Sequence, residues 1–242
     1  MPDALFDEPR LAHVYDPLEP GRRDLDAYGA LVDELGARTV LDIGCGTGTF
    51  ACLLAARGVR VIGVDPSAAS LDVARSKPGA HLVRWLRVDA AAIRDLQVDL
   101  ATMTGNVAQV FLTDDAWAAA LTGIRSALRP EGWLVFETRD PAARAWVQWN
   151  RASSHTRAFL RDGSTVESWV EVTGVRESLV SFRTNFVFSS DGAELVSIST
   201  LRFRSRVEIE ASLTIAGFHV IEVRDAPDRP GLELVFIAQR PE

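Results

Sequence analysis

The stretch VLDIGCGTG at residues 40–48 constrains the fold of this chain more than any other. A short apolar run ends in Asp42, and Gly44, Gly46 and Gly48 then alternate with small residues. Ordering three glycines costs conformational entropy, so their placement needs a physical reason. A glycine turn between a buried strand and a helix brings bare backbone and the free N–H groups of the helix start against a ligand. The stretch therefore predicts a nucleotide-like binding site in a doubly wound α/β sheet.

The chain around this turn alternates between strand and helix patterns. Strands are expected at residues 39–44, 59–65, 82–89, 98–105 and 132–140. Helices are expected at residues 25–36, 47–58, 66–76 and 114–130, with a short helical piece at 90–96 and with Pro130 ending the last full helix. Strands separated by helices of this length pair in parallel, so the pattern predicts a parallel sheet with helices on both faces.

The pattern changes near residue 141. Between residues 153 and 205 apolar and polar residues alternate with period two in three runs, 166–172, 178–189 and 193–204. Turn residues separate these runs, which predicts three or four antiparallel strands. A helix at 207–218 and two antiparallel strands at 219–226 and 231–240 then return to the main sheet. We expect a main domain of residues 1–140 and 206–242 and an antiparallel β insert of residues 141–205.

Composition excludes several classes of function. The 242 residues carry a net charge of −7 without a cluster of basic residues, which argues against a nucleic acid partner. No apolar run approaches the roughly 18 residues that span a bilayer, and the start of the chain lacks a signal-peptide pattern, so we expect a cytoplasmic protein with no membrane partner. Cys45 and Cys52 make no metal framework, and no metal site is predicted.

Three kinds of glycine turn compete at residues 44–48. A phosphate-binding Walker A loop needs Gly-Lys-Ser/Thr at its end, but Gly48 is followed by Thr49 and Phe50. A dinucleotide turn needs G-x-G-x-x-G, and Ala51 stands where the third glycine or alanine could sit. An NAD-dependent oxidoreductase therefore remains an alternative.

The third kind of turn fits best because three expected strands end in aspartates, namely Asp42, Asp65 and Asp89. Asp65 follows Gly44 by 21 residues, where a carboxylate can accept two hydrogen bonds from a ribose diol. Asp89 is placed to meet an adenine edge. A ligand with a cationic amino-acid group and no phosphate explains why the turn offers no basic residue.

A series of motifs carries a family resemblance. VLDIGCGTG, VIGVDPSAASLDVAR, VDAAAI, DLATMTGNVAQVF and LRPEGWLVFETRD, in that order, resemble the successive motifs of class I S-adenosylmethionine-dependent methyltransferases. The resemblance covers about residues 10–140 and resumes at 206–242. It implies a Rossmann-like seven-stranded sheet in the order 3-2-1-4-5-7-6 with strand 7 antiparallel. It also implies S-adenosylmethionine as cofactor, methyl transfer to a nitrogen or oxygen of a small molecule, and S-adenosylhomocysteine as product.

The resemblance assigns cofactor contacts to Gly44, Cys45, Gly46, Asp65, Pro66, Asp89, Ala90 and Met103. It implies that the glycine turn follows the methionine and ribose groups, that Asp65 binds the ribose hydroxyls and that Pro66 packs on the adenine. Asp89 and the amide of Ala90 would address the adenine edge, and the carbonyl of Met103 the methionine amino group. For Asp42, a cofactor contact and a structural role in holding loop amides stay equally open.

A looser resemblance concerns HVYDPLEPGRRD, the strand-rich segment after FETRDP, and RFRSRVEIEASLTIAGF. These segments are similar to N-methyltransferases that dimethylate the amino group of nucleotide-linked deoxysugars. This implies that Tyr15 lies over cofactor and substrate and that Arg22 lies near the cofactor carboxylate. The stretch TGNVAQVF departs from that subfamily on the substrate side, which leaves the acceptor open.

Methyl transfer from a sulfonium depends mainly on alignment of the reactants, so no elaborate catalytic dyad is needed. We expect Tyr15, Asn106 and His155 to act at the acceptor, with Gln109 and Arg139 nearby. The insert is expected to cover the pocket, to form a homodimer, or both. A non-catalytic protein that binds S-adenosylmethionine or serves in assembly is the second alternative.

Overall fold

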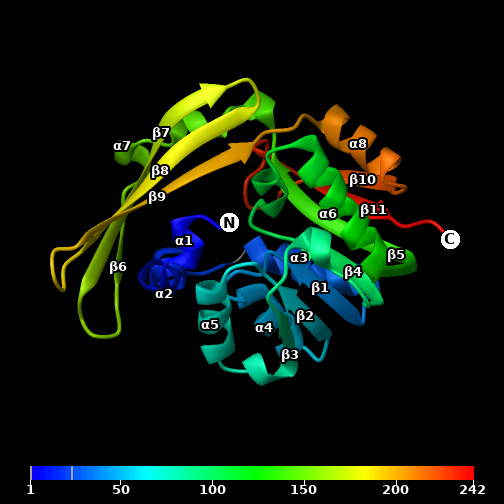
Figure 1. Cartoon of the computed structure of the whole chain (residues 1–242), viewed down its shortest axis with the longest axis horizontal. Helices are drawn as coiled ribbons and strands as arrows, with labels where there is room; N and C mark the ends of the chain where they lie inside the picture. The colour runs from blue at the N-terminus through cyan, green and yellow to red at the C-terminus, as the bar shows by residue number, and fades with distance from the viewer. Residues whose placement is uncertain (1, 23) are drawn as a thin grey trace.

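The computed structural model of the chain describes residues 2–22 and 24–242 and contains two sheets (Figure 1). The larger sheet has seven strands in the order β3-β2-β1-β4-β5-β11-β10. Its strands are β1 (Thr39–Ile43), β2 (Arg60–Val64), β3 (Val83–Leu86), β4 (Val98–Met103), β5 (Leu128–Arg139), β10 (His219–Asp225) and β11 (Glu233–Gln239). β11 runs antiparallel to both β5 and β10, whereas the other neighbours pair in parallel. The predicted fold class, strand order and reversed last strand are confirmed.

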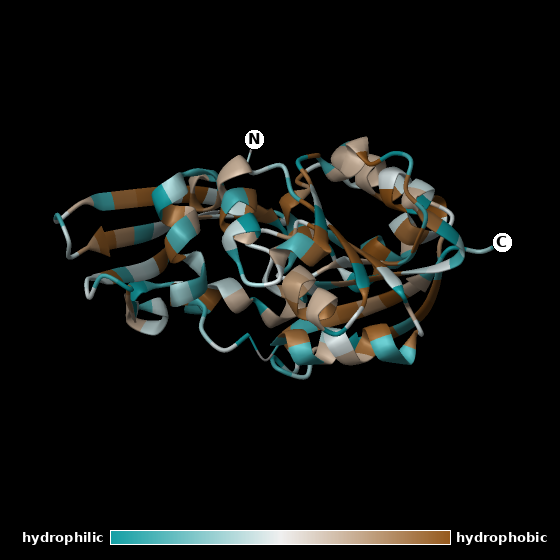
Figure 2. Ribbon diagram, turned by 90° about the horizontal axis from the view of Figure 1, so that it is seen from below, coloured by the Kyte–Doolittle hydropathy of each residue, from teal (hydrophilic) through white to brown (hydrophobic). Residues whose placement is uncertain are grey.

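Helices cover both faces of this sheet. They are α3 (Asp24–Glu34), α4 (Thr49–Ala56), α5 (Ala68–Ser76), α6 (Asp114–Ala127) and α8 (Arg206–Ile215), with 3₁₀ turns η1 (Ala80–Leu82), η2 (Ala90–Ala92) and η3 (Val107–Val110). Apolar residues of β1 alternate between the faces: Leu41 belongs to the core under α6 and α8, and Val40 to the core under α3 and α4. Figure 2 shows the resulting hydrophobic strands between more polar helix surfaces.

The second sheet is antiparallel and has four strands in the order β6-β7-β8-β9. They are β6 (Thr156–Phe159), β7 (Thr165–Arg176), β8 (Leu179–Phe188) and β9 (Glu194–Arg202), which agrees with the expected three or four strands. The connection from β5 to β6 contains η4 (Pro141–Ala143), η5 (Ala145–Gln148) and α7 (Arg151–Ser154), none of which was predicted.

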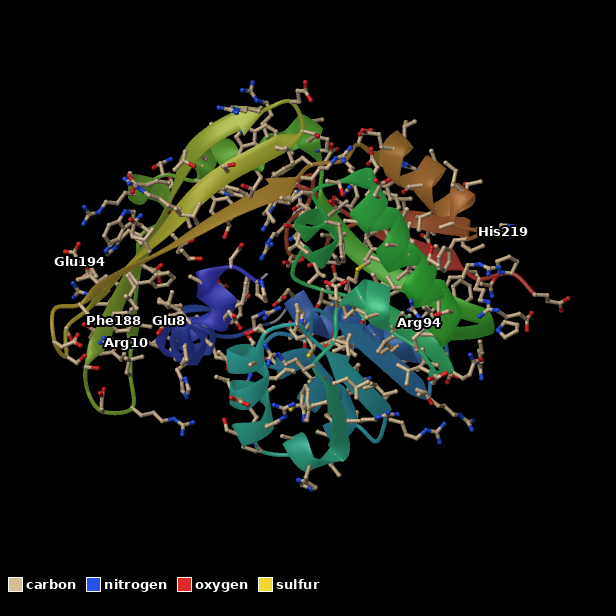
Figure 3. All side chains as sticks on the ribbon, in the orientation of Figure 1. Glu8, Arg10, Arg94, Phe188, Glu194 and His219 are labelled. Carbon is tan, nitrogen blue, oxygen red and sulfur yellow. The ribbon has the colours of Figure 1, made fainter. Side chains whose placement is uncertain are left out.

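Two unpredicted helices at the N-terminus, α1 (Ala4–Asp7) and α2 (Pro9–Leu18), lie between the two sheets (Figure 1). Leu11 and Val14 of α2 pack against Val166 and Phe186 of the second sheet. Arg10 lies over the ring of Phe188 at 3.8 Å and pairs with Asp191 at 2.9 Å, as Figure 3 shows for Arg10 and Phe188. The apolar partners of α2 are thus far away in sequence, so the pattern of apolar residues within this short segment did not predict the helix.

The predicted boundary between the helix expected at 114–130 and the strand expected at 132–140 is wrong. The helix expected to reach Pro130 ends at Ala127, and β5 begins at Leu128, which already pairs with Val98 of β4. The register between β4 and β5 then shifts before Trp133 pairs with Leu100. A proline, which has no N–H to donate, is tolerated at such an irregularity, so it sits inside the strand instead of ending the helix.

Within the described residues, no helix combines the length and the apolar character that a bilayer span requires.

Substitution of Trp117 in α6 tests how much the packing under this helix contributes to stability. Its ring packs 5.6 Å from the rings of Phe111 and Phe136, and its Nε1 donates to Ser212 Oγ at 2.8 Å. We expect Trp117→Ala to lower the free energy of unfolding by about 3–5 kcal/mol because it leaves a large buried cavity. The control Ile215→Ala, at a side chain that is 87% exposed, should change it by less than about 0.5 kcal/mol. Urea unfolding measures both, and equal effects would contradict the prediction.

Candidate functional site

The glycine turn after β1 has the backbone conformation that only glycine adopts readily. Gly44, Gly46 and Gly48 have φ angles of +65°, +52° and +76°. A Cβ at Gly44 would lie 2.6 Å from Val107 Cγ2, and one at Gly48 would lie 2.5 Å from the ring of Trp85. A Cβ at Gly46 would meet nothing within 4 Å. Gly44 and Gly48 are therefore required by packing, whereas Gly46 borders open space.

That open space is a cavity of about 640 Å³ at the carboxyl ends of the strands. Its size lies within the range of small-molecule sites, roughly 300–1,000 Å³. Its wall includes ten of the eleven residues predicted to bind a cofactor: Tyr15, Arg22, Asp42, Gly44, Cys45, Gly46, Asp65, Pro66, Asp89 and Ala90. Met103, at the end of β4, is fully buried, and the next residues, Thr104 and Gly105, form the wall instead.

Asp65 holds the glycine turn in place. One carboxylate oxygen accepts from the N–H of Gly46 at 2.9 Å, and the other accepts from the N–H of Ser67 at 2.8 Å. Burial raises the pKa of Asp65, although these two hydrogen bonds oppose the rise. Because each carboxylate oxygen has two acceptor sites, the side chain can still accept hydrogen bonds from a ligand in the cavity.

The two other strand-end aspartates differ in their partners. Asp89 accepts from the N–H of Ala91 at 3.0 Å and so caps η2. Asp42 accepts from Thr102 Oγ1 at 3.3 Å across β1 and β4, and its Oδ2 is buried without a partner among the described residues. Burial raises the pKa of Asp42 to about 7. Among the described residues Asp42 holds no loop amide, and its one side-chain partner is Thr102.

The N-terminal segment of residues 2–22 covers one side of the cavity and is tied to the glycine turn. Thr47 Oγ1 donates to Asp16 Oδ1 at 2.6 Å, and Lys77 Nζ pairs with Asp16 Oδ2 at 2.7 Å. Lys77 also donates to Thr49 Oγ1 at 2.6 Å. The only lysine of the chain therefore links α2 to the turn and to the end of α5. Tyr15, the residue before Asp16, is held against the cavity by this link.

A second, smaller pocket of about 110 Å³ adjoins the first, and Tyr15, Arg22 and Gly105 line both. Its wall is strongly polar and consists of Tyr15, Glu19, Arg22, Asp24, Gly105, Asn106, Glu137, Arg139, Asp228, Arg229 and Glu233. Five carboxylates thus face three guanidinium groups. Asn106 and Arg139 were expected near the acceptor, and the structure places both here.

The remaining predicted residues lie outside both cavities. Gln109 is fully buried and accepts from Arg139 Nη1 at 2.9 Å. His155 lies between α7 and β6, where its ring contacts Glu167 of β7 at 3.1 Å and stacks on Trp169. The structure does not bring His155 to either cavity. Glu137 and Glu233 were missed, although a glutamate inside the apolar run WLVFETR is a signal that could have identified Glu137.

Comparison with known proteins agrees with this geometry. Residues 40–132 match the family described as methyltransferase domain. The cypemycin N-terminal methyltransferase of Streptomyces is 36% identical over 133 residues, which cover 53% of each chain. A solved S-adenosylmethionine-dependent methyltransferase from Clostridium acetobutylicum matches with a TM-score of 0.77 at 17% identity, over 96% of this chain and 98% of that one. This is the fold of the S-adenosylmethionine-dependent methyltransferases.

A further solved structure with the methyltransferase fold is CalS10, an amino pentose methyltransferase from Micromonospora echinaspora with bound S-adenosylmethionine. It matches with a TM-score of 0.71 at 21% identity, over 91% of this chain and 92% of that one. The chain spans little more than half the length of the first curated relatives that it matches, 53% and 57%. The matched domain and these structures support S-adenosylmethionine as the cofactor.

The buried Asp42 predicts how the stability of the ligand-free protein depends on pH. Its pKa is raised from an ordinary acidic value to about 7 in the folded state, so the folded state holds one more proton than the unfolded state between about pH 4 and 7. The free energy of unfolding should therefore fall as the pH rises through this range, by up to about 1.4 kcal/mol per pH unit for one group. Asp42→Asn should reduce this slope in urea unfolding. An unchanged slope would contradict the prediction.

The link through Lys77 predicts a local effect on α2. Lys77→Ala removes the ammonium group between Asp16 and Thr49, so α2 should open more often. A loss of about 1 kcal/mol corresponds to roughly fivefold faster amide exchange in residues 9–18, measured by hydrogen–deuterium exchange. The control Arg75→Ala removes an exposed pair within α5 and should leave α2 unchanged. Unaltered protection of α2 in Lys77→Ala would show that the link does not hold the segment.

Proposed function

We propose that this chain transfers the methyl group of S-adenosylmethionine to an amino nitrogen of a small molecule. The observation that carries the proposal is the pair of adjoining cavities: one bordered by the open side of Gly46, the other lined by an excess of carboxylates. The acidic pocket favours a cationic or amino acceptor over a hydroxyl group. Two similar proteins, an N-terminal methyltransferase and an amino pentose methyltransferase, support a nitrogen acceptor.

The larger cavity fits the cofactor. The bare backbone at Gly46 leaves room for a ligand to lie against the turn, and Asp65 keeps acceptor sites for ribose hydroxyls. Asp89 and Ala90 line this cavity and are proposed to meet the adenine, and Arg22, which also lines it, is proposed to meet the cofactor carboxylate. Bound S-adenosylmethionine would supply a methyl group on an already cationic sulfur. The protein then has to align the acceptor and exclude water, which can raise the effective concentration of reactants to about 10⁵–10⁸ M.

The insert of residues 141–205 is proposed to cover the site. Ile198 and Thr200 of β9 lie on the wall of the larger cavity, which the glycine turn also lines. The N-terminal segment packs on this sheet through Leu11 and Val14 and on α5 of the main domain through Ala12. A homodimer through the same sheet is a further proposal, supported by Phe159 of the edge strand β6, which is 77% exposed.

The methyltransferase proposal is favoured over the two alternatives. The matched family and the relatives named above are methyltransferases, which favours the proposal over a nicotinamide-dependent oxidoreductase. A non-catalytic binding protein would not need the second polar pocket beside the cofactor cavity, where buried charges are costly to maintain. An assay of S-adenosylmethionine turnover with a set of amines distinguishes an enzyme from a non-catalytic binding protein, because only the enzyme forms S-adenosylhomocysteine.

Binding of S-adenosylhomocysteine tests the proposal, with Asp65→Ala as the informative variant. The wild-type protein should bind this product in isothermal titration, and Asp65→Ala should bind about 10–100-fold more weakly because it loses the brace of Gly46 and the ribose contact. Asp72→Ala, an exposed aspartate of α5, is the matched control and should bind normally. Absence of heat with the wild-type protein at saturating concentration, or normal binding by Asp65→Ala, would contradict the assignment.

A further inference from the structure

Glu137, near the end of β5, has one oxygen committed to the fold and the other free. Its Oε1 accepts from the N–H groups of Gly105 at 2.5 Å and Asn106 at 3.1 Å. No described residue donates a hydrogen bond to Oε2. Since Glu137 lines the small polar pocket, this free oxygen belongs to a carboxylate that is fixed in position and lacks a donor.

Asn106, which lines the same pocket, has a second oxygen without a donor. The residue is 2% exposed, and its Nδ2 donates to Glu233 Oε1 at 3.0 Å. Because an ionised carboxylate only accepts hydrogen bonds, Glu233 fixes the orientation of the amide. Oδ1 of Asn106 is then buried and, among the described residues, has no partner. An unsatisfied buried acceptor is costly, and a donor on a bound ligand would satisfy it.

Four other candidate bases near the cavities are less suited to this role. Glu233 pairs with Arg229 Nη1 at 2.7 Å, and Asp65 accepts from two backbone amides. Burial raises the pKa of the Tyr15 phenol, so it stays protonated near neutral pH. Asp42 lies near the end of β1 and lines the larger cavity. Glu137 instead lies on β5, beyond β4, and lines the small polar pocket.

We infer that Glu137 receives the amino group of the acceptor and takes its proton, while Asn106 Oδ1 accepts a second hydrogen bond from the same nitrogen. The inference rests on the proposed function. The ammonium R–NH₃⁺ gives one proton to the carboxylate, which leaves R–NH₂ and a neutral Glu137. The nitrogen lone pair then forms the new N–C bond as the methyl–sulfur bond breaks and its electron pair stays on sulfur. The product is a secondary ammonium, and the proton leaves Glu137 for water.

The surroundings of Glu137 suit this step. Burial, followed by the nearby Glu233 carboxylate, raises the pKa of Glu137 to about 7, which suits a general base at neutral pH. The charged and titratable groups that share its pocket are Tyr15 and Glu19 from α2, Arg22 and Asp24 before and in α3, Arg139 on β5, Asp228 and Arg229 before β11, and Glu233 on β11. The pocket holds five carboxylates and three guanidinium groups, and this excess of acidic groups attracts the ammonium form of the acceptor to Glu137.

The test uses a pair of adenosine analogues, because the acceptor is unidentified. In both, nitrogen replaces the sulfur of S-adenosylhomocysteine; in one it carries a 2-aminoethyl arm, and in the other an ethyl arm. Only the first presents an ammonium group where the acceptor nitrogen would lie. The wild-type protein should bind the aminoethyl analogue roughly 10–100-fold more tightly than the ethyl analogue, since the ammonium gains charge-assisted hydrogen bonds.

Glu137→Gln keeps an oxygen for the amides of Gly105 and Asn106 but cannot take a proton. This variant should bind S-adenosylhomocysteine and the ethyl analogue as the wild type does, and it should lose the preference for the aminoethyl analogue. Titrations at pH 7 in buffers of different ionisation enthalpy should show release of about half a proton when the wild type binds the aminoethyl analogue, because a cation favours ionised Glu137. Glu137→Gln should not show this release. The matched control is Glu131→Gln, at the exposed other end of β5.

The outcomes separate the inference from the proposed function. Failure of the wild type to bind S-adenosylhomocysteine overturns the proposed function. Normal binding of that product together with an equal preference for the ammonium arm in wild type and Glu137→Gln overturns only the inference. An equal loss of affinity for all three ligands in Glu137→Gln also overturns it, since the carboxylate would then serve the cofactor or the loop. If Glu137→Gln does not fold, Asn106→Gly, which suits the φ of +62° there, carries the same comparison.

Discussion

The site depends on one backbone constraint, the passage of the chain through three left-handed residues directly after the central strand β1. The N–H groups of Gly44 and Cys45 donate to the carbonyl of Val64, and Gly46 donates to Asp65, so the turn is fixed by the neighbouring strand β2. The glycine turn also holds the loop after β4 and the helix α2 in place. Val107 closes over Gly44 from the loop after β4, and Thr47 holds α2 through Asp16. A shift of the turn would therefore displace the floor, the wall and the cover of the cavity together.

The central fold could be predicted because its signals are local. Strands such as β1 and β2 are short apolar runs that end in an aspartate, and the turn residues before β11 show that the last two strands form a hairpin. The N-terminal helices could not be predicted in this way, because Leu11 and Val14 find their apolar partners on the insert, about 150 residues later. The prediction that Pro130 ends a helix was wrong for a related reason. Whether this proline follows a helix or lies within a strand depends on the register between β4 and β5.

The same distinction separates the two halves of the site. The wall of the larger cavity follows from strand ends, and residues such as Asp65 and Asp89 are recognisable from their place in the sequence. The polar pocket requires knowledge of which strands are neighbours. Glu137 and Glu233 are almost a hundred residues apart and meet only because β11 inserts between β5 and β10. His155 was wrongly expected near the acceptor, because the sequence around a lone histidine does not indicate which side of the insert faces the cavities.

The distribution of unpaired polar atoms connects the fold with its function. Among the described residues, five buried side-chain atoms lack a hydrogen-bond partner. Three are the Nε atoms of Arg202, Arg204 and Arg240, whose guanidinium groups make other hydrogen bonds. The other two, Asp42 Oδ2 and Asn106 Oδ1, are oxygens, and each belongs to a residue that lines one of the two adjoining cavities. Folding leaves such groups unsatisfied only rarely, because each costs about 1–3 kcal/mol. Asp42 lies on β1 and Asn106 follows the adjacent strand β4, so ligands bound in the two adjoining cavities would be placed to supply the missing donors.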